Sequence, residues 1–161
     1  LNVSAVSAAD PNWLAALLAL IDGRSDIAPR LTVEITETMA IRDLDEAARF
    51  VATLRDLGCH VGLDDFGAGY TSFRHLRSLA VDTVKIDGSF VADLAENPDN
   101  QLIVRTLVDL VRNFDLTTVA ESVGDAAAAA LLRGYGVERL QGFYCGRPET
   151  QPRWAMEPPA R

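Results

Sequence analysis

The chain has 161 residues, of which 48% are hydrophobic and 24% are charged. This composition suits one folded domain and is not that of a disordered segment. The formal net charge of −8 argues against binding to long nucleic acids, because such binding depends on neutralising many phosphates with Lys and Arg. The two cysteines, Cys59 and Cys145, match no zinc-ligand spacing and indicate a reduced, cytoplasmic setting. No apolar run reaches the ~18 residues of a membrane span, but the chain lacks an initiating Met, so the intact protein can carry an upstream membrane anchor.

Strand and helix patterns alternate along the chain. Asp10 and Pro11 predict the N-cap and first turn of one helix, and glycines at 23, 58 and 134 predict helix ends. Strands are expected at residues 1–3, 31–36, 59–63, 83–86, 116–120 and 137–143, and helices at 13–21, 43–57, 72–79, 100–113 and 125–133. This order requires crossover connections, and therefore predicts an α/β fold with a mostly parallel sheet, either doubly wound or part of a barrel. We expect one domain at residues 1–150 and a Pro-rich C-terminal tail at 151–161.

Polar side chains lie at or near the end of every expected strand. In parallel α/β folds these ends meet at one edge of the sheet, where functional groups gather. The residues are Asn2, Glu34, Glu37, Asp64, Asp65, Lys85, Asp87, Glu121 and Gln141. Clustered carboxylates repel one another unless they bind cations or share protons, and a ligand set of oxygens without Cys or His favours Mg²⁺ or Mn²⁺. Adjacent Asp64 and Asp65 suit two ions, an arrangement that recurs in phosphodiester hydrolysis.

Individual residues support a site rather than a solvated edge. Glu34 alternates with Val33 and Ile35, so it faces the opposite side of its strand and needs a partner there. Lys85 is the only lysine in a chain with fourteen arginines, and it lies within an apolar strand, where a compact ammonium suits pairing with carboxylates. Asp87 precedes Gly88, a pair common in turns, so its role stays open between a turn residue and a substrate ligand.

The successive motifs resemble those of EAL domains. They are Asn2-Val3-Ser4, Glu34-Ile35-Thr36-Glu37, Asp64-Asp65-Phe66-Gly67-Ala68-Gly69-Tyr70-Thr71-Ser72, Lys85-Ile86-Asp87, Ala120-Glu121-Ser122-Val123 and Gln141-Gly142-Phe143-Tyr144. The resemblance runs from residue 2 to about residue 149. It implies a TIM-type (β/α) barrel with a modified strand order, and metal-dependent hydrolysis of cyclic-di-GMP to linear pGpG in bacterial second-messenger signalling.

The resemblance also implies a role for each matching residue. Asn2, Glu34, Asp64 and Asp65 are the implied ligands of two Mg²⁺ or Mn²⁺ ions, with Asp64 bridging. Lys85 is expected to orient the attacking water, Glu121 to act near the second metal as a general base, and Gln141 to hold water or substrate. Asp87 is implied as a further substrate contact. Glu37 is expected to anchor the loop at 66–72, which in this family couples metal binding to homodimer formation.

Two departures keep other functions open. The chain supplies six of the eight strands of a barrel, and the segment with the family's Glu-Ala-Leu motif is absent. Ala120-Glu121-Ser122-Val123-Gly124 has Gly124 where the family has a second glutamate. The alternatives are a catalytically silent EAL domain that acts as a cyclic-di-GMP receptor or dimerisation scaffold, and an unrelated doubly wound regulatory domain with an acidic Mg²⁺ pocket. The intact protein is expected to carry an upstream sensory or GGDEF domain.

Overall fold

The computed structural model describes residues 1–24, 26–69 and 73–150. The strands are β1 (Asn2–Val3), β2 (Thr32–Thr36), β3 (His60–Phe66), β4 (Thr83–Ile86), β5 (Thr117–Ala120) and β6 (Arg139–Leu140). The helices are α1 (Ala5–Ala8), α2 (Pro11–Ile21), α3 (Glu37–Arg42), α4 (Leu44–Asp56), α5 (Phe73–Ser78), α6 (Pro98–Asn113) and α7 (Ala126–Tyr135), with short 3₁₀ turns η1 (Ala28–Arg30) and η2 (Gly88–Phe90). Within these ranges, none of the helices combines the length and apolar character that crossing a membrane requires. The expected tail at 151–161 lies outside the described residues.

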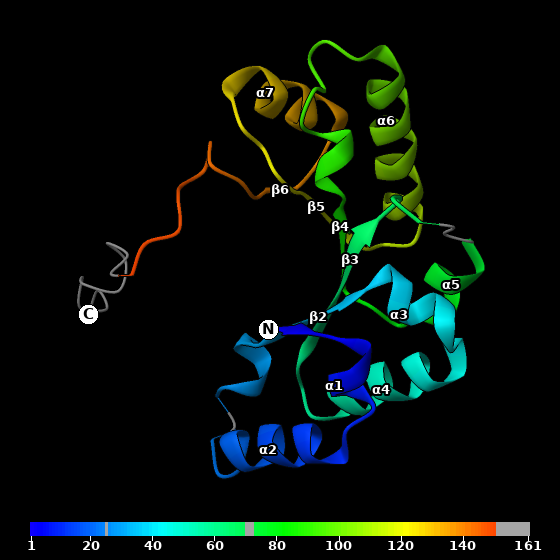
Figure 1. Ribbon diagram of the computed structural model, residues 1–161, viewed down its shortest axis with the longest axis vertical. Helices are drawn as coiled ribbons and strands as arrows, with labels where there is room; N and C mark the ends of the chain where they lie inside the picture. The colour runs from blue at the N-terminus through cyan, green and yellow to red at the C-terminus, as the bar shows by residue number, and fades with distance from the viewer. Residues whose placement is uncertain (25, 70–72, 151–161) are drawn as a thin grey trace.

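The six strands form one parallel sheet in the order β1-β2-β3-β4-β5-β6. The strands cross the middle of the molecule, with α1, α2 and α4 at one end and α6 and α7 at the other (Figure 1). Strands that follow chain order through right-handed crossovers carry all their helices on one face, whereas a doubly wound sheet reverses its order at a switch point. The sequential order therefore confirms the expected barrel-type α/β architecture and excludes the doubly wound alternative.

The two faces of the sheet differ in chemistry. Val33, Ile35, Val84 and Ile86 point toward the helices and are 0% exposed. One apolar cluster joins α2 and α4 to β1–β4, and a second joins α6 and α7 to β4 and β5. The residues between these core positions belong to the other face, the inner side of a barrel-type sheet. The core thus supports the sheet from outside and leaves the inner face to polar side chains.

Several element boundaries agree with the sequence and others differ. Asp10 caps α2 by accepting a hydrogen bond from Asn12 N at 2.9 Å, with Pro11 in the first turn. Helix α7 continues through Gly134 and ends at Gly136, whose φ of +90° provides the left-handed cap, so the predicted end at Gly134 was wrong. The last strand is much shorter than the predicted 137–143. Helices α1 and α3 were not predicted, because four and six residues are too few to show helical periodicity.

Candidate functional site

The inner face of the sheet carries the predicted polar residues in register. Glu34 pairs with Asn2 on β1 and with Gly62 on β3, and aligned residues of parallel strands share a face. An ideal Cβ on Gly62 would lie 3.4 Å from Glu34 Cγ, so the glycine leaves room for the glutamate. A cavity of about 680 Å³ opens on this face, and Glu34, Lys85 and Gln141 are among its lining residues.

Lys85 is the centre of the site. Its side chain is 5% exposed, and its Nζ lies 3.0 Å from Glu34 Oε2, 3.0 Å from Asp64 Oδ1 and 2.6 Å from Glu121 Oε1. Burial alone would lower the pKa of Lys85, but hydrogen bonds to the three carboxylates outweigh it and raise the pKa above its ordinary value. One buried ammonium therefore gathers carboxylates from the middle of β2, from near the end of β3 and from just after β5.

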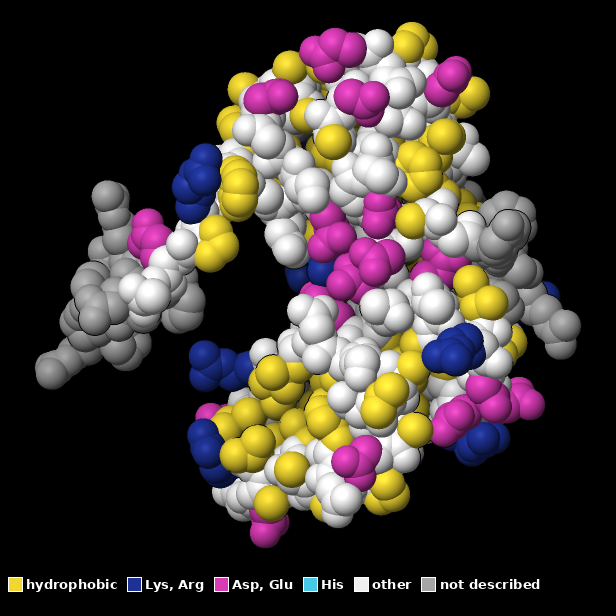
Figure 2. All heavy atoms as spheres, viewed as in Figure 1, with side chains coloured by type: hydrophobic (Ala, Val, Ile, Leu, Met, Phe, Trp, Pro, Cys, Tyr) yellow, Lys and Arg dark blue, Asp and Glu magenta, His cyan; other side chains and the backbone are white. Residues whose placement is uncertain are grey.

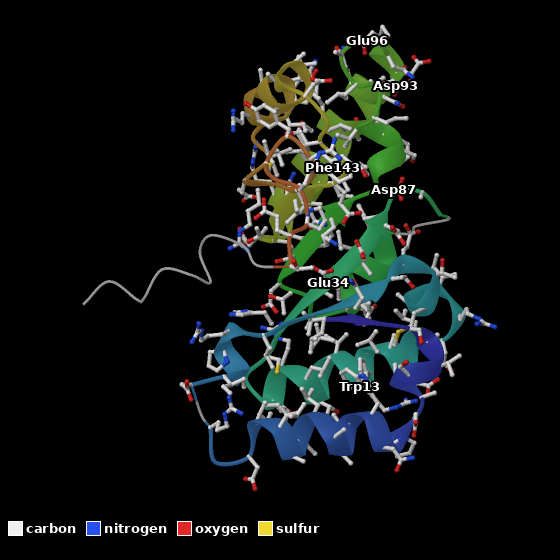
Figure 3. The ribbon with its side chains drawn as sticks, turned by 60° about the vertical axis from the view of Figure 1, so that its left-hand side comes forward. Trp13, Glu34, Asp87, Asp93, Glu96 and Phe143 are labelled. Atoms are coloured by element: carbon white, nitrogen blue, oxygen red, sulfur yellow. The ribbon has the colours of Figure 1, made fainter. Side chains whose placement is uncertain are left out.

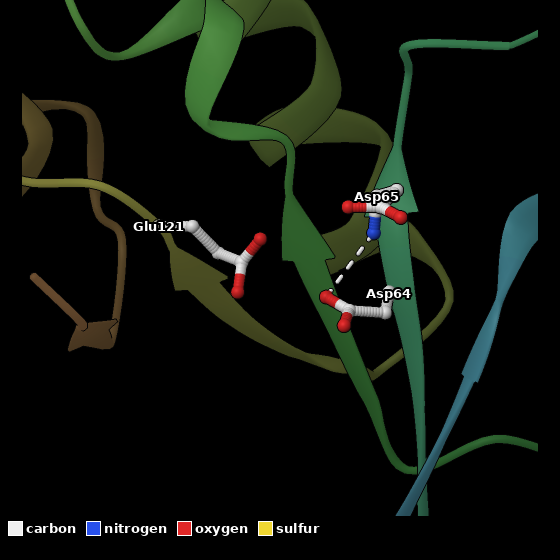
Figure 4. Close-up of side chains that lie close together, drawn as sticks. All are labelled: Asp64, Asp65 and Glu121. Atoms are coloured by element: carbon white, nitrogen blue, oxygen red, sulfur yellow. Dashed lines mark hydrogen bonds between the residues drawn. The ribbon is translucent and has the colours of Figure 1, made fainter. Parts of the chain in front are cut away.

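Asp64 and Asp65 are both brought to the site by an irregularity in β3. The β3–β4 register shifts between Leu63 and Phe66, and Asp65 has a φ of +58°. This bulge breaks the alternation that would send two consecutive side chains to opposite faces. Asp65 N donates a hydrogen bond of 3.2 Å to Asp64 Oδ1 (Figure 4).

Asp64, Asp65 and Glu121 form a compact group of carboxylates. Each offers one oxygen, and these oxygens all lie within 4.8 Å of one another. Burial and then repulsion by Asp64 raise the pKa of Asp65. Burial also raises the pKa of Glu121, although the hydrogen bond to Lys85 opposes it. Acidic side chains gather in the middle of the face shown in Figure 2. An all-oxygen donor set under mutual repulsion fits a hard divalent cation.

The other predicted residues lie around this centre in different ways. Asn2 is exposed, and its register partner is Glu34. Asp87 Oδ1 accepts a hydrogen bond of 2.7 Å from Ser89 N and so caps η2, and the charge of Asp87 contributes to raising the pKa of Asp65. Gln141 is exposed beside the β5 end, where its backbone N–H donates to Ala120 O at 2.8 Å.

Glu37 lies behind the site as a buried carboxylate, 3% exposed. Its Oε2 accepts a hydrogen bond of 3.0 Å from Gly67 N. An ideal Cβ on Gly69 would lie 2.8 Å from Glu37 Oε1, so a larger residue there would require the Glu37 carboxylate to shift. Glu37 thus contacts the beginning of the loop predicted at 66–72, while residues 70–72 lie outside the described part of the chain.

A second cavity, of about 440 Å³, adjoins the site and adds Phe143, for which the sequence predicted no role. Glu121, Gln141, Gly124 and Phe143 line it. Phe143 is 61% exposed, and the Arg147 guanidinium carbon lies 4.4 Å from its ring centroid. Asp87 and Phe143 lie in the same upper half of the molecule, above Glu34 (Figure 3). The available signal was an aromatic residue directly after a functional strand end.

Comparison with known proteins assigns the family. The EAL domain family model matches residues 1–148. Cyclic di-GMP phosphodiesterase PdeB of Shewanella oneidensis is 42% identical over 116 residues, which are 72% of this chain and 14% of PdeB. The chain spans 14–19% of the length of the curated relatives that it matches.

Solved structures show the same relationship. The PaMucR phosphodiesterase in complex with c-di-GMP superposes with a TM-score of 0.88 and 33% identity over 97% of this chain and 62% of that one. The EAL domain of Mycobacterium smegmatis DcpA superposes with a TM-score of 0.83 and 36% identity over 91% of this chain and 66% of that one. The chain therefore belongs to the EAL domain family.

Proposed function

We propose that this chain is the catalytic part of a phosphodiesterase that hydrolyses cyclic-di-GMP to linear pGpG. The observation that carries the proposal is the contact of the buried Lys85 ammonium with carboxylates that come from β2, from β3 and from just after β5, with Asp65 close by. A receptor that only binds the dinucleotide has no need of a complete water-activating set. The names of PdeB and of the PaMucR complex support the same substrate.

The site is proposed to hold two Mg²⁺ or Mn²⁺ ions. Four carboxylates, those of Glu34, Asp64, Asp65 and Glu121, stand against the single positive charge of Lys85, which leaves a formal charge of −3. An anionic phosphodiester would be repelled from such a site without cations. Asn2, Glu34, Asp64 and Asp65 are the proposed ligands, with Asp64 shared between the ions. When bound, such ions stabilise negative charge on the phosphate oxygens and lower the pKa of a bound water.

Residues of this chain are proposed to perform the other steps of the reaction. Lys85, whose three protons face Glu34, Asp64 and Glu121 in this structure, would turn one of them to the water oxygen to orient it. Glu121, whose pKa burial raises, is suited to take the proton of that water. The new bond joins the water oxygen to phosphorus, and the bond from phosphorus to the ribose 3′ oxygen breaks. That oxygen takes a proton from solvent to become the 3′-OH, and the proton on Glu121 returns to solvent. Gln141 and Asp87 are proposed to contact the substrate, and the exposed ring of Phe143 suits stacking on a guanine base.

The proposal also covers homodimer formation, the other domains of the intact protein and its location in the cell. Glu37 is proposed to couple metal binding to homodimer formation through the segment that begins at Gly67, with which it is hydrogen-bonded. An upstream sensory or GGDEF domain is proposed for the intact protein, since the relative MucR of Pseudomonas aeruginosa is named a bifunctional diguanylate cyclase and phosphodiesterase. A cytoplasmic location is proposed, and the two free cysteines, Cys59 and Cys145, fit it.

One observation favours a second candidate, a cyclic-di-GMP receptor or dimerisation scaffold without turnover. Gly124 stands where the family has a glutamate, and it lines the 440 Å³ cavity beside Glu121. A carboxylate that supports an active site from this position is therefore missing, and loss of such support reduces turnover.

The experiment that decides between the two candidates is hydrolysis of cyclic-di-GMP with Mn²⁺. It compares the full-length protein that carries this chain, the 161-residue chain, and the full-length protein with Asp64→Asn. Turnover that disappears in the Asp64→Asn variant supports the enzyme. Binding of the dinucleotide by the full-length protein without any cleavage contradicts the enzyme and supports the receptor.

A further inference from the structure

The ends of β4 and β5 touch each other just beyond the last hydrogen bonds of the sheet. Glu121 N donates to Ile86 O at 3.2 Å. Just beyond this bond, Gly88, two residues after Ile86, lies against Ser122, the residue after Glu121. An ideal Cβ on Gly88 would lie 2.6 Å from Ser122 Cβ and still closer to its Oγ. Carbon atoms in contact are about 3.5–4.0 Å apart. The chain can therefore hold a side chain at one of these two positions but not at both.

The backbone of Ser122 is strained beside this contact. Its φ is +54°, in the left-handed region that costs a residue other than glycine about 1–2 kcal/mol. Its neighbours are fixed on both sides, because Glu121 is bonded to β4 and Val123 N donates to Gln141 O at 3.0 Å. Strain that persists at a site is maintained by the surrounding structure, and it points to a local function.

Ser122, with its left-handed backbone, lies between two side chains that point to different environments. Before it, Glu121 points to Lys85 at 2.6 Å. After it, Val123 is buried at 0% exposure, where Gly142 packs so closely that an ideal Cβ there would lie 2.9 Å from Val123 C. The backbone turn at Ser122 therefore determines the direction of the Glu121 side chain at the end of β5. The contact with Gly88 determines the position of Ser122.

We infer that Gly88 and Ser122 are positioning residues, whose mutual contact holds Glu121 in reach of Lys85 and of the Asp64–Asp65 pair. The inference rests on the proposed function, because it specifies how the general base of that reaction is placed. Ser122 lines the 440 Å³ cavity beside Glu121, and neither residue is assigned a contact with the reacting atoms. Their effect is transmitted through the backbone of residues 121–123.

The test is a double-mutant cycle in the full-length protein that carries this chain, with Gly88→Ala, Ser122→Gly and the two combined. Gly88→Ala forces Ser122 aside, and a misplacement of about 1 Å can reduce turnover by about 100-fold. We expect kcat to fall by at least 10-fold while KM changes by less than about 3-fold. Ser122→Gly removes the contact and lowers kcat by several-fold. In the combined variant the methyl group of Ala fills the vacated space, and kcat returns to within about 3-fold of the original protein.

Two further measurements distinguish a positioning effect from a folding defect and from failure of the proposed function. Gly134→Ala is the control, because an ideal Cβ there meets nothing within 4 Å and helix α7 accepts alanine. The second readout is the affinity of the Mn²⁺ site that Asp65→Asn weakens. This affinity should fall at least 10-fold in Gly88→Ala and recover in the combined variant. If the protein does not hydrolyse cyclic-di-GMP, the proposed function fails, while the Mn²⁺ affinities still test the positioning. Unchanged kcat and Mn²⁺ affinity in Gly88→Ala, or no recovery in the combined variant, overturns the inference.

Discussion

Replacing Lys85 by methionine tests whether one buried ammonium holds the strand ends together. The Lys85 side chain is 5% exposed, while Glu34, Asp64 and Glu121 retain 22%, 16% and 15% exposure. Removing one partner of a buried ion pair costs about 3–5 kcal/mol, because the remaining charge is left unpaired. Here the three carboxylates keep some contact with water, so we expect the low end, about 3 kcal/mol at pH 7.

The assay is urea unfolding in buffer with EDTA, which excludes cations that would neutralise the carboxylates. With a slope near 2 kcal/mol per molar urea, the midpoint of Lys85→Met should fall by roughly 1.5 M. Lys85→Met combined with Glu34→Gln should recover part of this loss, since one of the repelling charges is gone. Lys85→Arg keeps the charge but not the three-way contact, so it should lose less stability than Lys85→Met while remaining below the original protein.

The loss should also depend on pH, with a sign that follows from linkage. Burial already raises the pKa of Glu121, and the hydrogen bond to Lys85 opposes that rise. Without the ammonium, the pKa of Glu121 in the folded variant therefore lies further above its unfolded value. The folded variant then binds more protons than the unfolded chain, so its stability relative to the original protein improves as pH falls from 7 toward about 4. A stability at pH 7 within about 0.5 kcal/mol of the original protein, or a difference that does not change with pH, would refute the assigned role of Lys85.

Three further predictions concern the rest of the chain. Asp65→Asn should lower Mn²⁺ affinity at least 10-fold by calorimetry and leave urea stability unchanged or higher, because it removes repulsion by Asp64; a lower stability contradicts this. Gly124→Glu should raise kcat, with Gly146→Glu as control, since both glycines line the same cavity and neither has an atom within 4 Å of an ideal Cβ; equal effects contradict the role of position 124. A thiol reagent should modify exposed Cys145 within minutes but spare buried Cys59, whose pKa burial raises, until urea unfolds the chain; early modification of both contradicts the packing.

The sequence predicted the sheet well because its two faces differ in composition. Val33 and Ile35 alternate with Glu34, and Val84 and Ile86 flank Lys85, so period-2 patterning separated the core face from the functional face. The rarity of lysine in this chain indicated the residue on which the three carboxylates converge. These features are local, and local patterns are what a sequence displays directly.

The features that escaped prediction depend on tertiary contact. The bulge that turns Asp65 toward Asp64 follows from the β3–β4 register, which no window of sequence contains. Gly134 and Gly136 are both plausible helix ends by composition, and the fold selects Gly136, whose φ is +90°. The contact of Gly88 with Ser122 joins residues 34 positions apart in the chain.

The choice of lysine over arginine at position 85 follows from the geometry of the site. An ammonium is compact and can direct its three protons at three oxygens, whereas a guanidinium is planar and presents its donors as a fork. Glu34, Asp64 and Glu121 approach from β2, β3 and the end of β5, and all three carboxylates reach Nζ within 3.0 Å. A planar group in that buried position would pair with one or two of them and displace the third. A chain that uses arginine at every other basic position therefore has a physical reason to use lysine at this one.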